Sequence, residues 1–337
     1  MVLVGKMRMD IRLKSMTAFF AVLCLLSGCN DPDPEKPDRD QTPVAKSGTL
    51  TDDSFYKAVP SVLSPVALNQ MISNPESFTL LDIRPKEEYL AGHIPGAIQI
   101  WRSDIEDSTK AFFSTVANRN QLESLLSRKC VLPGKRIVAY DDKGNVNAAR
   151  MWWILRMYGH EKVFLLNGGL QGWKASGFEL DTKLPDCVNP QTFNFSGAEK
   201  PEMLTTIQTI AGNLKSDSII FLDVRSRREY TGEEIKERSS RPGHIQGAIW
   251  MEYSKAIQAG QGEDFTFKPV EELRKLYSDA GIDGSKPVIT YCYSGYRSSL
   301  SLFVLQEILG YKQCSNYAAS WIEWSRVDSL PADFILP

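Results

Sequence analysis

The sequence is poor in the features that most often mark metal, nucleotide and nucleic-acid binding. It has three His, and its six Cys include no Cys-x-x-Cys pair, so the spacing of a structural zinc site is absent. The net charge of −2 offers no basic footprint for nucleic acid. No Gly-x-Gly-x-x-Gly follows an expected strand, and there is no Walker-type Gly-Lys-Ser/Thr motif. We therefore expect no metal, no nucleotide or other cofactor and no nucleic-acid partner.

The N-terminal segment has the features of an export signal. Basic residues precede an apolar run at 16–26, which is too short for an ordinary membrane-spanning helix. The next residues, Leu26-Ser27-Gly28-Cys29, resemble a bacterial lipobox. That resemblance implies cleavage before Cys29, a lipid on its sulfur, and attachment to a bacterial membrane on the periplasmic side or cell surface. An ordinary secretory signal with an incidental Cys is the alternative.

A set of short motifs occurs twice along the chain. Three pairs carry the repeat: LLDIR at 80–84 with FLDVR at 221–225, GHIPGAI at 92–98 with GHIQGAI at 243–249, and RIVAY at 136–140 with PVITY at 287–291. An internal repeat of this length predicts two copies of one structural unit. With 337 residues, 42% of them hydrophobic, the chain is long enough to form two ordinary cores.

The spacing of the repeat sets the domain boundaries. Tyr140 and Tyr291 are 151 residues apart, whereas Asp82 and Asp223 are 141 apart. The second copy therefore carries ten extra residues, within 231–242. The expected organisation is a signal peptide over 1–28, a disordered tether rich in Pro and Asp over 29–59, a first domain over 60–180, a linker over 181–200 and a second domain over 201–334.

Both units are expected to be α/β, each a parallel sheet with helices on both faces. The runs at 78–83, 137–140 and 163–166, with 219–224 and 288–291 in the second copy, are short and rich in β-branched residues. Helical patterns follow several of them, and 298–309 places Leu302, Leu305 and Leu309 on one stripe before Gly310. In such sheets the functional loops follow the carboxyl ends of the strands.

Cys292 is the candidate reactive residue because it directly follows the strand at 288–291. The order is strand, Cys-x-x-Gly-x-Arg-Ser, helix. Backbone N–H groups of so short a loop can point inward, and Gly295 gives the conformational freedom for a tight ring. Positive potential of this kind lowers the pKa of a thiol and favours the nucleophilic thiolate. Arg297 is expected to hold an oxyanion by paired hydrogen bonds.

The remaining Cys of the expected domains are interpreted differently. Cys130, Cys187 and Cys314 are expected to be small buried hydrophobes, or, for some pair, a disulfide in an exported chain. The sequence alone leaves these alternatives open. Asp82, Asp223, His93 and His244 are expected to anchor loops by hydrogen bonds, and Trp152, Trp153, Trp321 and Trp324 to lie in the core.

Several features of the chain carry a family resemblance: the tandem units, the Asp-x-Arg strand ends, Arg241-Pro242-Gly243-His244-Ile245, the Cys292 loop and the Ser320-Trp321-Ile322-Glu323-Trp324 segment. Together they resemble a two-domain rhodanese, or thiosulfate sulfurtransferase. The resemblance covers about 60–330. It implies two similar α/β domains with the active Cys only in the second. That Cys would take sulfane sulfur from a small anionic donor, best represented by thiosulfate, and pass it as a persulfide to cyanide or a thiol.

The first copy fits this expectation. Its position matching Cys292 is Asp141, which has no sulfur nucleophile, so the first domain is expected to be inactive and to wall the site. Arg84, Asp141 and Trp101 are candidates for lining an interdomain cleft. In the second copy, Arg225 matches the family's substrate-binding Arg. The remaining expected substrate contacts are the loop residues Tyr293, Ser294, Gly295, Tyr296, Arg297 and Ser298.

One position departs from the family pattern and leaves the donor open. Tyr293 follows the Cys where thiosulfate enzymes commonly have Arg, so polysulfide, a protein persulfide or a selenium oxyanion are further candidates. A phosphatase of the Cdc25-like branch would need Cys-x5-Arg, and Arg297 lies one position too early. The other rival is a non-catalytic sensor or binding module of the same fold, since the first copy shows that a unit can lose its Cys.

Overall fold

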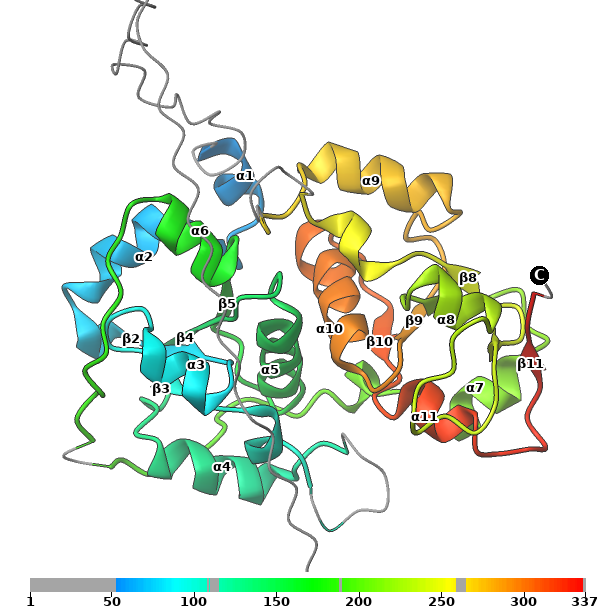
Figure 1. Cartoon of the computed structure of the whole chain (residues 1–337), viewed down its shortest axis with the longest axis horizontal. Coiled ribbons are helices and arrows are strands. Elements are labelled where there is room, and N and C mark those ends of the chain that lie inside the picture. The colour runs from blue at the N-terminus through cyan, green and yellow to red at the C-terminus, as the bar shows by residue number, and fades with distance from the viewer. Residues whose placement is uncertain (1–52, 108, 110–114, 188–189, 259–264, 336–337) are drawn as a thin grey trace, which may run out of the picture. The chain divides into compact units, whose positions relative to one another are not determined.

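A parallel sheet forms the centre of each repeated unit in the computed structural model of the chain (Figure 1). The structure describes residues 53–107, 109, 115–187, 190–258 and 265–335. The signal peptide, Cys29 and most of the expected tether lie outside these residues. The expected tether ran to residue 59, but helix α1 spans Asp53–Ala58, and Phe55 on this helix and Val59 just after it are buried. The described fold therefore begins before that boundary.

The first domain contains a five-stranded sheet in the order β1-β5-β4-β2-β3, with every pair parallel. Its strands are β1 (Val62–Leu63), β2 (Phe78–Asp82), β3 (Ile98–Gln99), β4 (Arg136–Tyr140) and β5 (Val163–Leu166). Strand β2, which lies between β4 and β3, is buried along its whole length, as expected for a parallel sheet covered on both faces. The helices are α2 (Pro65–Ile72), α3 (Lys86–Ala91), α4 (Arg119–Arg128), α5 (Val146–Met157) and α6 (Gly169–Ala175).

The second domain repeats this plan with a four-stranded parallel sheet in the order β10-β9-β6-β8. Its strands are β6 (Ile220–Asp223), β8 (Ile249–Trp250), β9 (Val288–Tyr291) and β10 (Cys314–Asn316), and β7 (His244–Ile245) pairs separately with β11 (Ala332–Asp333). The helices are α7 (Ile207–Asn213), α8 (Arg227–Thr231), α9 (Val270–Asp279), α10 (Tyr296–Phe303) and α11 (Ser320–Trp324). No helix among the described residues has the length and apolar character needed to cross a membrane.

The predicted strands and the predicted α/β class are confirmed, with small shifts at their ends. β9 has the predicted bounds, and β6 is one residue shorter at each end. The predicted helix at 298–309 begins two residues earlier, at Tyr296, and its last part, Val304–Ile308, is a π-helical turn. Gly310 ends it with a left-handed φ of 75°, a conformation that glycine adopts at no steric cost.

The Asp-x-Arg strand ends anchor loops in both domains, as predicted. Arg84 donates Nη2 to Asp82 Oδ2 (2.6 Å) and to the Gly92 carbonyl (2.8 Å). Arg225 makes the same two contacts, to Asp223 (2.6 Å) and to the Gly243 carbonyl (2.8 Å). Both arginines are nearly fully buried, so each pair fixes the turn that follows a strand.

His93 and His244 also make matching contacts in the two domains. Each ring stacks on an earlier tyrosine of its own domain, His93 on Tyr89 and His244 on Tyr230. Each Nδ1 is 2.8–2.9 Å from the carbonyl oxygen of that tyrosine. Their role is structural, as predicted.

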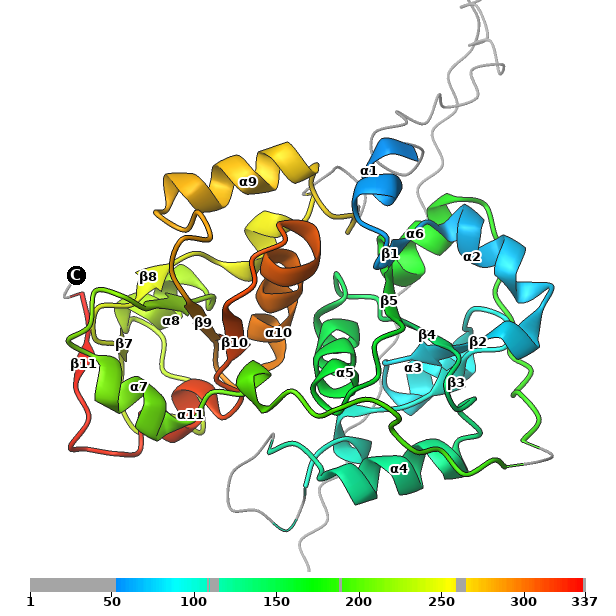
Figure 2. The same cartoon turned by 180° about the vertical axis from the view of Figure 1, so that it is seen from behind.

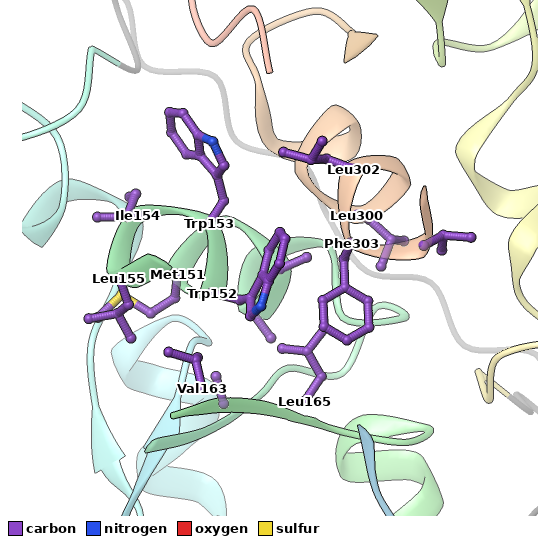
Figure 3. Close-up of a cluster of buried hydrophobic side chains, with 14 of the residues drawn as sticks. Met151, Trp152, Trp153, Ile154, Leu155, Val163, Leu165, Leu300, Leu302 and Phe303 are labelled. Carbon is purple, nitrogen blue, oxygen red and sulfur yellow. The ribbon is translucent and has the colours of Figure 1, made fainter. Parts of the chain in front are cut away.

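One hydrophobic core joins the two domains across helices α5 and α10. Trp152 of α5 packs edge-to-face on Phe303 of α10, with ring centroids 5.0 Å apart, as Figure 3 shows. Trp153 donates its indole N–H to the Met203 carbonyl of the second domain's first turn (2.9 Å). The predicted core position of Trp152, Trp153, Trp321 and Trp324 is confirmed, since each is at most 2% exposed.

The linker follows the surface of the first domain. Phe193 and Phe195 are buried, and Arg119 of α4 donates to the Phe195 carbonyl (2.6 Å). Lys200 then donates its N–H to the Met157 carbonyl at the end of α5 (2.8 Å). The view from behind shows this segment running from α4 past α5 towards α7 (Figure 2).

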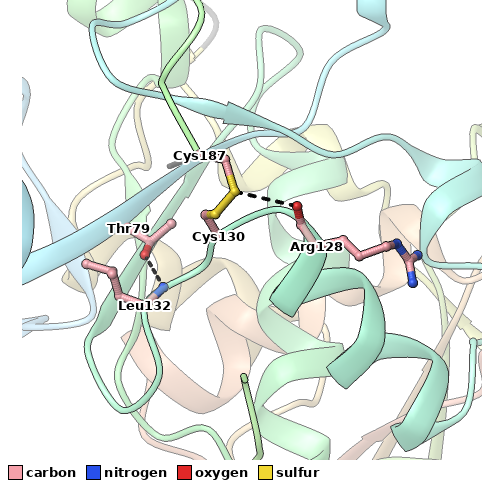
Figure 4. Close-up of a disulfide and its surroundings, with 5 residues drawn as sticks. All are labelled: Thr79, Arg128, Cys130, Leu132 and Cys187. Carbon is pink, nitrogen blue, oxygen red and sulfur yellow. Dashed lines mark hydrogen bonds between the residues drawn. A yellow bond between two sulfur atoms is a disulfide. The ribbon is translucent and has the colours of Figure 1, made fainter. Parts of the chain in front are cut away.

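A disulfide ties the start of the linker to the first domain. Cys130, just after α4, pairs with Cys187, and their Cα atoms are 5.8 Å apart (Figure 4). Cys292 and Cys314 are free and buried. The structure thus selects a disulfide for one pair of the Cys that the sequence left undecided.

Replacing Cys130 and Cys187 together by Ser is expected to destabilise the protein by up to about 4 kcal/mol. The disulfide closes a loop of 57 residues, and its loss gives that entropy back to the unfolded chain. Urea unfolding of the double variant and the parent, with and without reductant, measures the effect. Reductant should lower the parent to the level of the variant and leave the variant unchanged. A parent unaffected by reductant would contradict the pairing.

Candidate functional site

Cys292 lies where the parallel sheet of the second domain presents its carboxyl edge. It directly follows β9, and the loop from Cys292 to Gly295 leads into α10. Gly295 adopts a left-handed φ of 84°, which turns the chain sharply into the helix. The thiol is only 1% exposed. The loop therefore closes around the sulfur and does not display it on an open surface.

Backbone and side-chain donors of the loop surround the sulfur. The N–H of Gly295 donates to Cys292 Sγ (3.1 Å). The Ser298 hydroxyl lies 3.6 Å from Sγ, but it also donates to Asn316 Oδ1 over 2.7 Å, so its contact with the sulfur is the weaker of the two. The predicted loop residues Ser294, Gly295 and Ser298 are thus brought together at Cys292.

The two free cysteines in the described part of the chain have opposite electrostatic surroundings. Burial raises the pKa of the Cys292 thiol, but the charge of Arg297 and the backbone N–H groups of Ser298 and Ser294 outweigh burial, and the net pKa is lowered. Burial alone dominates at Cys314 and raises its pKa to about 12. Of these two, only Cys292 is placed to react as a thiolate.

Ser320 and Asn316 hold the loop from outside, and neither was singled out as a site residue from the sequence. Ser320 Oγ accepts the N–H of Cys292 (3.1 Å) and donates to the Tyr317 carbonyl (2.7 Å). It does so with a left-handed φ of 56°, an uncommon conformation for a residue other than glycine that often marks a functional site. The matching residue of the first domain, 151 positions earlier, is Gly169, with φ 54°. The replacement of this Gly by Ser in the second copy is the sequence signal that could have pointed to Ser320 as a site residue.

Arg297 does not present a free fork to a substrate. Its Nη1 and Nη2 donate to the two carboxylate oxygens of Glu229 over 2.6 and 2.8 Å. Burial raises the pKa of Glu229, but Arg297 more than reverses this and lowers it to about 2. Paired hydrogen bonds were predicted for Arg297, and the structure directs them to a carboxylate of the protein.

The Arg297–Glu229 pair exists only in the domain that has the Cys. The residue matching Glu229 in the first domain is Glu88, but the residue matching Arg297 is Val146. Glu229 was missed as a site residue, although Ser226 and Glu229 form a capping box that the sequence pattern Ser-x-x-Glu encodes. The structure thus couples the cap of α8 to the arginine beside the sulfur.

Three other residues predicted to contact substrate form hydrogen bonds with other parts of the protein. Tyr293 uses its hydroxyl to accept the N–H of Arg238 (3.1 Å), within the ten-residue insertion. Tyr296 donates its hydroxyl to Glu106 of the first domain (2.5 Å). Arg225 is held by Asp223 as described above, with the same geometry as in the domain without the Cys. Substrate contact by these three residues stays a prediction.

The first domain shows what the loop does when a carboxylate replaces the thiol. Asp141 is fully buried. Its two oxygens accept four backbone N–H groups, from Lys143, Asn145, Asn147 and Ala148, over 2.6–3.1 Å. Burial raises the pKa of Asp141, and these four bonds reverse part of that rise. The loop geometry shared by the two domains is therefore a ring of N–H donors around the residue that follows the strand.

The first-domain candidates for a cleft differ in exposure. Arg84 is 4% and Asp141 0% exposed, so both are buried. Trp101 is half-buried, beneath the guanidinium of Arg102 (5.4 Å). Within the described residues, no group of three or more His, Cys, Asp or Glu is arranged to hold a metal ion.

Comparison with known proteins agrees with this architecture. The profile of the Rhodanese-like domain matches residues 64–176 and 206–327. A Mycobacterium bovis protein named "Putative thiosulfate sulfurtransferase 1" is 36% identical over 255 residues, which cover 73% of this chain and 87% of that protein. A Haloferax volcanii protein named "Putative thiosulfate sulfurtransferase" is 32% identical, covering 79% of this chain and 92% of its own.

Solved structures similar to this chain have the same fold. The anaerobic ergothioneine biosynthesis enzyme of Chlorobium limicola, in complex with trimethyl histidine, has a TM-score of 0.71 and 25% identity, covering 82% of this chain and 71% of that one. A structure of EanB is described as having ergothioneine covalently linked with a persulfide cysteine. Two matched domains and relatives above 30% identity over most of the chain support sulfur transfer as the class of activity. The chain belongs to the rhodanese family, as a protein with two rhodanese-like domains in tandem.

Proposed function

We propose that the chain is a sulfurtransferase of the thiosulfate type that works through a persulfide on Cys292. The observation that carries the proposal is a thiol of lowered pKa inside a ring of donors. Both domains have such a ring, but only the second has a thiol in it. The Asp141 loop supports it, because the same ring surrounds a carboxylate with four N–H groups there. Such a ring favours a thiolate and, after sulfur uptake, the terminal sulfur anion of a persulfide.

The proposed reaction has two displacements. The Cys292 thiolate attacks the sulfane sulfur of thiosulfate, the sulfur–sulfur bond of the donor breaks, and sulfite leaves with the electron pair. Cyanide or a thiolate then attacks the outer sulfur of the persulfide. The new bond to sulfur forms as the bond to Cys292 Sγ breaks, which returns the thiolate. Sulfur moves with no net oxidation of the protein, so the proposal requires no cofactor.

Thiosulfate is proposed as donor from the names of the relatives. The pairing of Arg297 with Glu229 leaves the loop with less free positive charge than the sequence suggested. A donor whose charge is spread over several oxygens, or a polysulfide, would therefore bind mainly through the N–H groups of the ring. Cyanide and small thiols are the proposed acceptors.

Thiocyanate formation from thiosulfate and cyanide tests the proposal in the parent protein. We expect turnover with thiosulfate and none with an aryl phosphate. Comparable hydrolysis of the aryl phosphate would favour the Cdc25-like alternative. If no sulfane donor yields thiocyanate or a protein-bound sulfur, the binding-module alternative replaces the enzyme.

We also propose that the protein is exported and anchored by a lipid on Cys29. The lipobox-like sequence before Cys29 supports this, and so does the Cys130–Cys187 disulfide, since disulfides persist in oxidising compartments. Replacing Cys29 by Ser is expected to move the protein from the membrane fraction to the soluble fraction of cells. Unchanged membrane association of the variant would contradict lipid anchoring at Cys29.

A further inference from the structure

A cation of the first domain is buried directly behind the Cys292 loop. Arg150 lies on α5, the helix that packs on α10, and it is 1% exposed. Its guanidinium carbon is 4.6 Å from the ring centre of Trp153 on its own helix and 5.0 Å from that of Tyr296 at the start of α10. Removing a charged side chain from water is costly unless partners compensate. These aromatic faces provide part of that compensation.

Arg150 contacts the active loop through the Gly295 carbonyl. Nη1 of Arg150 lies 3.3 Å from this oxygen, which also accepts the Ser299 hydroxyl (2.7 Å) and the Asn316 amide (3.1 Å). A trans peptide is planar, so the carbonyl of Gly295 and the N–H of Tyr296 point in opposite directions. Donors that hold this carbonyl therefore also fix the orientation of the peptide that joins the Cys292 loop to α10.

The closeness of Arg150 also explains the glycine of the loop. A Cβ on Gly295 would lie 2.6 Å from Arg150 Nη1 and 2.4 Å from the Ala318 carbonyl oxygen. Both distances are too short for a carbon atom, so any side chain at this position would push the arginine away. The loop and the first-domain cation thus fit each other across the domain interface.

The arrangement is specific to the loop with the Cys. The second-domain residue that matches Arg150 in the repeat is Ser301, so the Asp141 loop receives no equivalent cation from α10. Burial lowers the pKa of Arg150, while Tyr296, Glu106 and Cys292 act in the opposite direction. An arginine remains charged in proteins even when buried. The positive charge is therefore placed at the loop that would carry negative sulfur.

We infer that Arg150 is a positioning residue of the sulfur site, by which the first domain holds the Gly295 peptide at the end of the Cys292 loop in place and adds a buried positive charge behind the loop. This inference rests on the sulfurtransferase proposal. It gives the Cys-less domain a part in the chemistry beyond walling the site. Because Arg150 acts through the Gly295 peptide, its loss should reduce turnover more than donor binding.

The test compares Arg150→Met and Arg150→Lys with the control Arg128→Met. Arg128 is a surface arginine on α4 that donates to Ser124, so its loss removes the same charge far from the loop. The first readout is the pH dependence of Cys292 alkylation by iodoacetamide, with Cys314→Ser as the background in every protein. The second is steady-state sulfur transfer from thiosulfate to cyanide, and thermal unfolding verifies that each variant is folded.

For Arg150→Met we expect the alkylation profile to move to higher pH, with alkylation at pH 7 slowed about tenfold. The kcat for sulfur transfer should fall by a similar factor with little change in KM, and Arg150→Lys should recover part of both effects. Arg128→Met should match the parent. If the Met variant does not fold, Arg150→Gln takes its place beside the Lys variant.

An unchanged alkylation profile in folded Arg150→Met or Arg150→Gln would overturn the inference and leave Arg150 a packing residue. The alkylation readout needs no sulfur donor. A parent protein without sulfur transfer, whose Cys292 still depends on Arg150 for reactivity, would therefore contradict the proposed function and not the role of Arg150.

Discussion

A Cys292→Ser protein is expected to form no thiocyanate above the uncatalysed rate, while a Cys314→Ser protein keeps the parent activity. A hydroxyl cannot store sulfane sulfur as a persulfide, and it is not ionised at neutral pH. Removal of a nucleophile that forms a covalent intermediate typically lowers kcat by about a thousandfold or more. The change from sulfur to oxygen is small, so the loop and its donors should keep their geometry.

Cys314 is a closely matched control for this substitution. It is also free and buried, it lies in the same domain, and it is the first residue of the strand next to β9. Its raised pKa, about 12, keeps it protonated at neutral pH. Activity retained in Cys292→Ser, or lost in a folded Cys314→Ser protein, would remove Cys292 from the centre of the chemistry.

Replacement of Arg297 by Met is expected to lower both the stability of the protein and the reactivity of Cys292. Glu229, 2% exposed, would lose the arginine that binds both its oxygens, and breaking a buried pair of this kind costs about 3 kcal/mol. The thiol would lose its main stabilising charge, so alkylation at pH 7 should slow by about tenfold. Urea unfolding and iodoacetamide kinetics measure the two effects separately.

Acidification should remove the stability difference between the parent and Arg297→Met. The folded-state pKa of Glu229 is about 2, below the ordinary value of 4.5, so the pair stabilises the fold above pH 4.5. That contribution is lost as the pH falls from 4.5 towards 2. A stability difference that stays constant down to pH 2 would contradict the ion pair as its source.

The double variant Arg297→Met, Glu229→Met separates the two roles of the arginine. With both charges gone, no carboxylate is left buried without a partner, and much of the lost stability should return. The slow alkylation should remain, because the charge beside the thiol is still missing. Recovery of parent-like alkylation in the double variant would show that Arg297 affects Cys292 only through the stability of the fold.

Much of the fold could be predicted because the repeat presents each strand and each loop twice. The motifs that end at Arg84 and Arg225 form the same buried Asp–Arg pair in the two domains. Residues that match in the repeat therefore make matching contacts in the structure. Cys292 could be predicted for a similar reason. Its strand and its glycine have counterparts in the first copy, and the residue that follows the strand is Cys in place of Asp141.

The partners of the charged side chains could not be predicted from the sequence. Arg297 was expected to bind a substrate oxyanion, but a guanidinium binds any carboxylate of suitable geometry, and the sequence does not reveal that α8 places Glu229 beside it. Arg150 contacts Gly295 across a separation of 145 residues, and only the packing of α5 on α10 brings them together. Similarly, Tyr293 turns towards an insertion that the first copy lacks.

The central claim, sulfur carried on Cys292, is tested most directly by mass spectrometry of the intact protein after incubation with thiosulfate and removal of the excess donor. The predicted result is a gain of one sulfur atom in the parent, mapped by peptide analysis to Cys292, absent from Cys292→Ser, and lost on addition of cyanide. Equal sulfur uptake by Cys292→Ser, or uptake by the parent that cyanide does not remove, would contradict it.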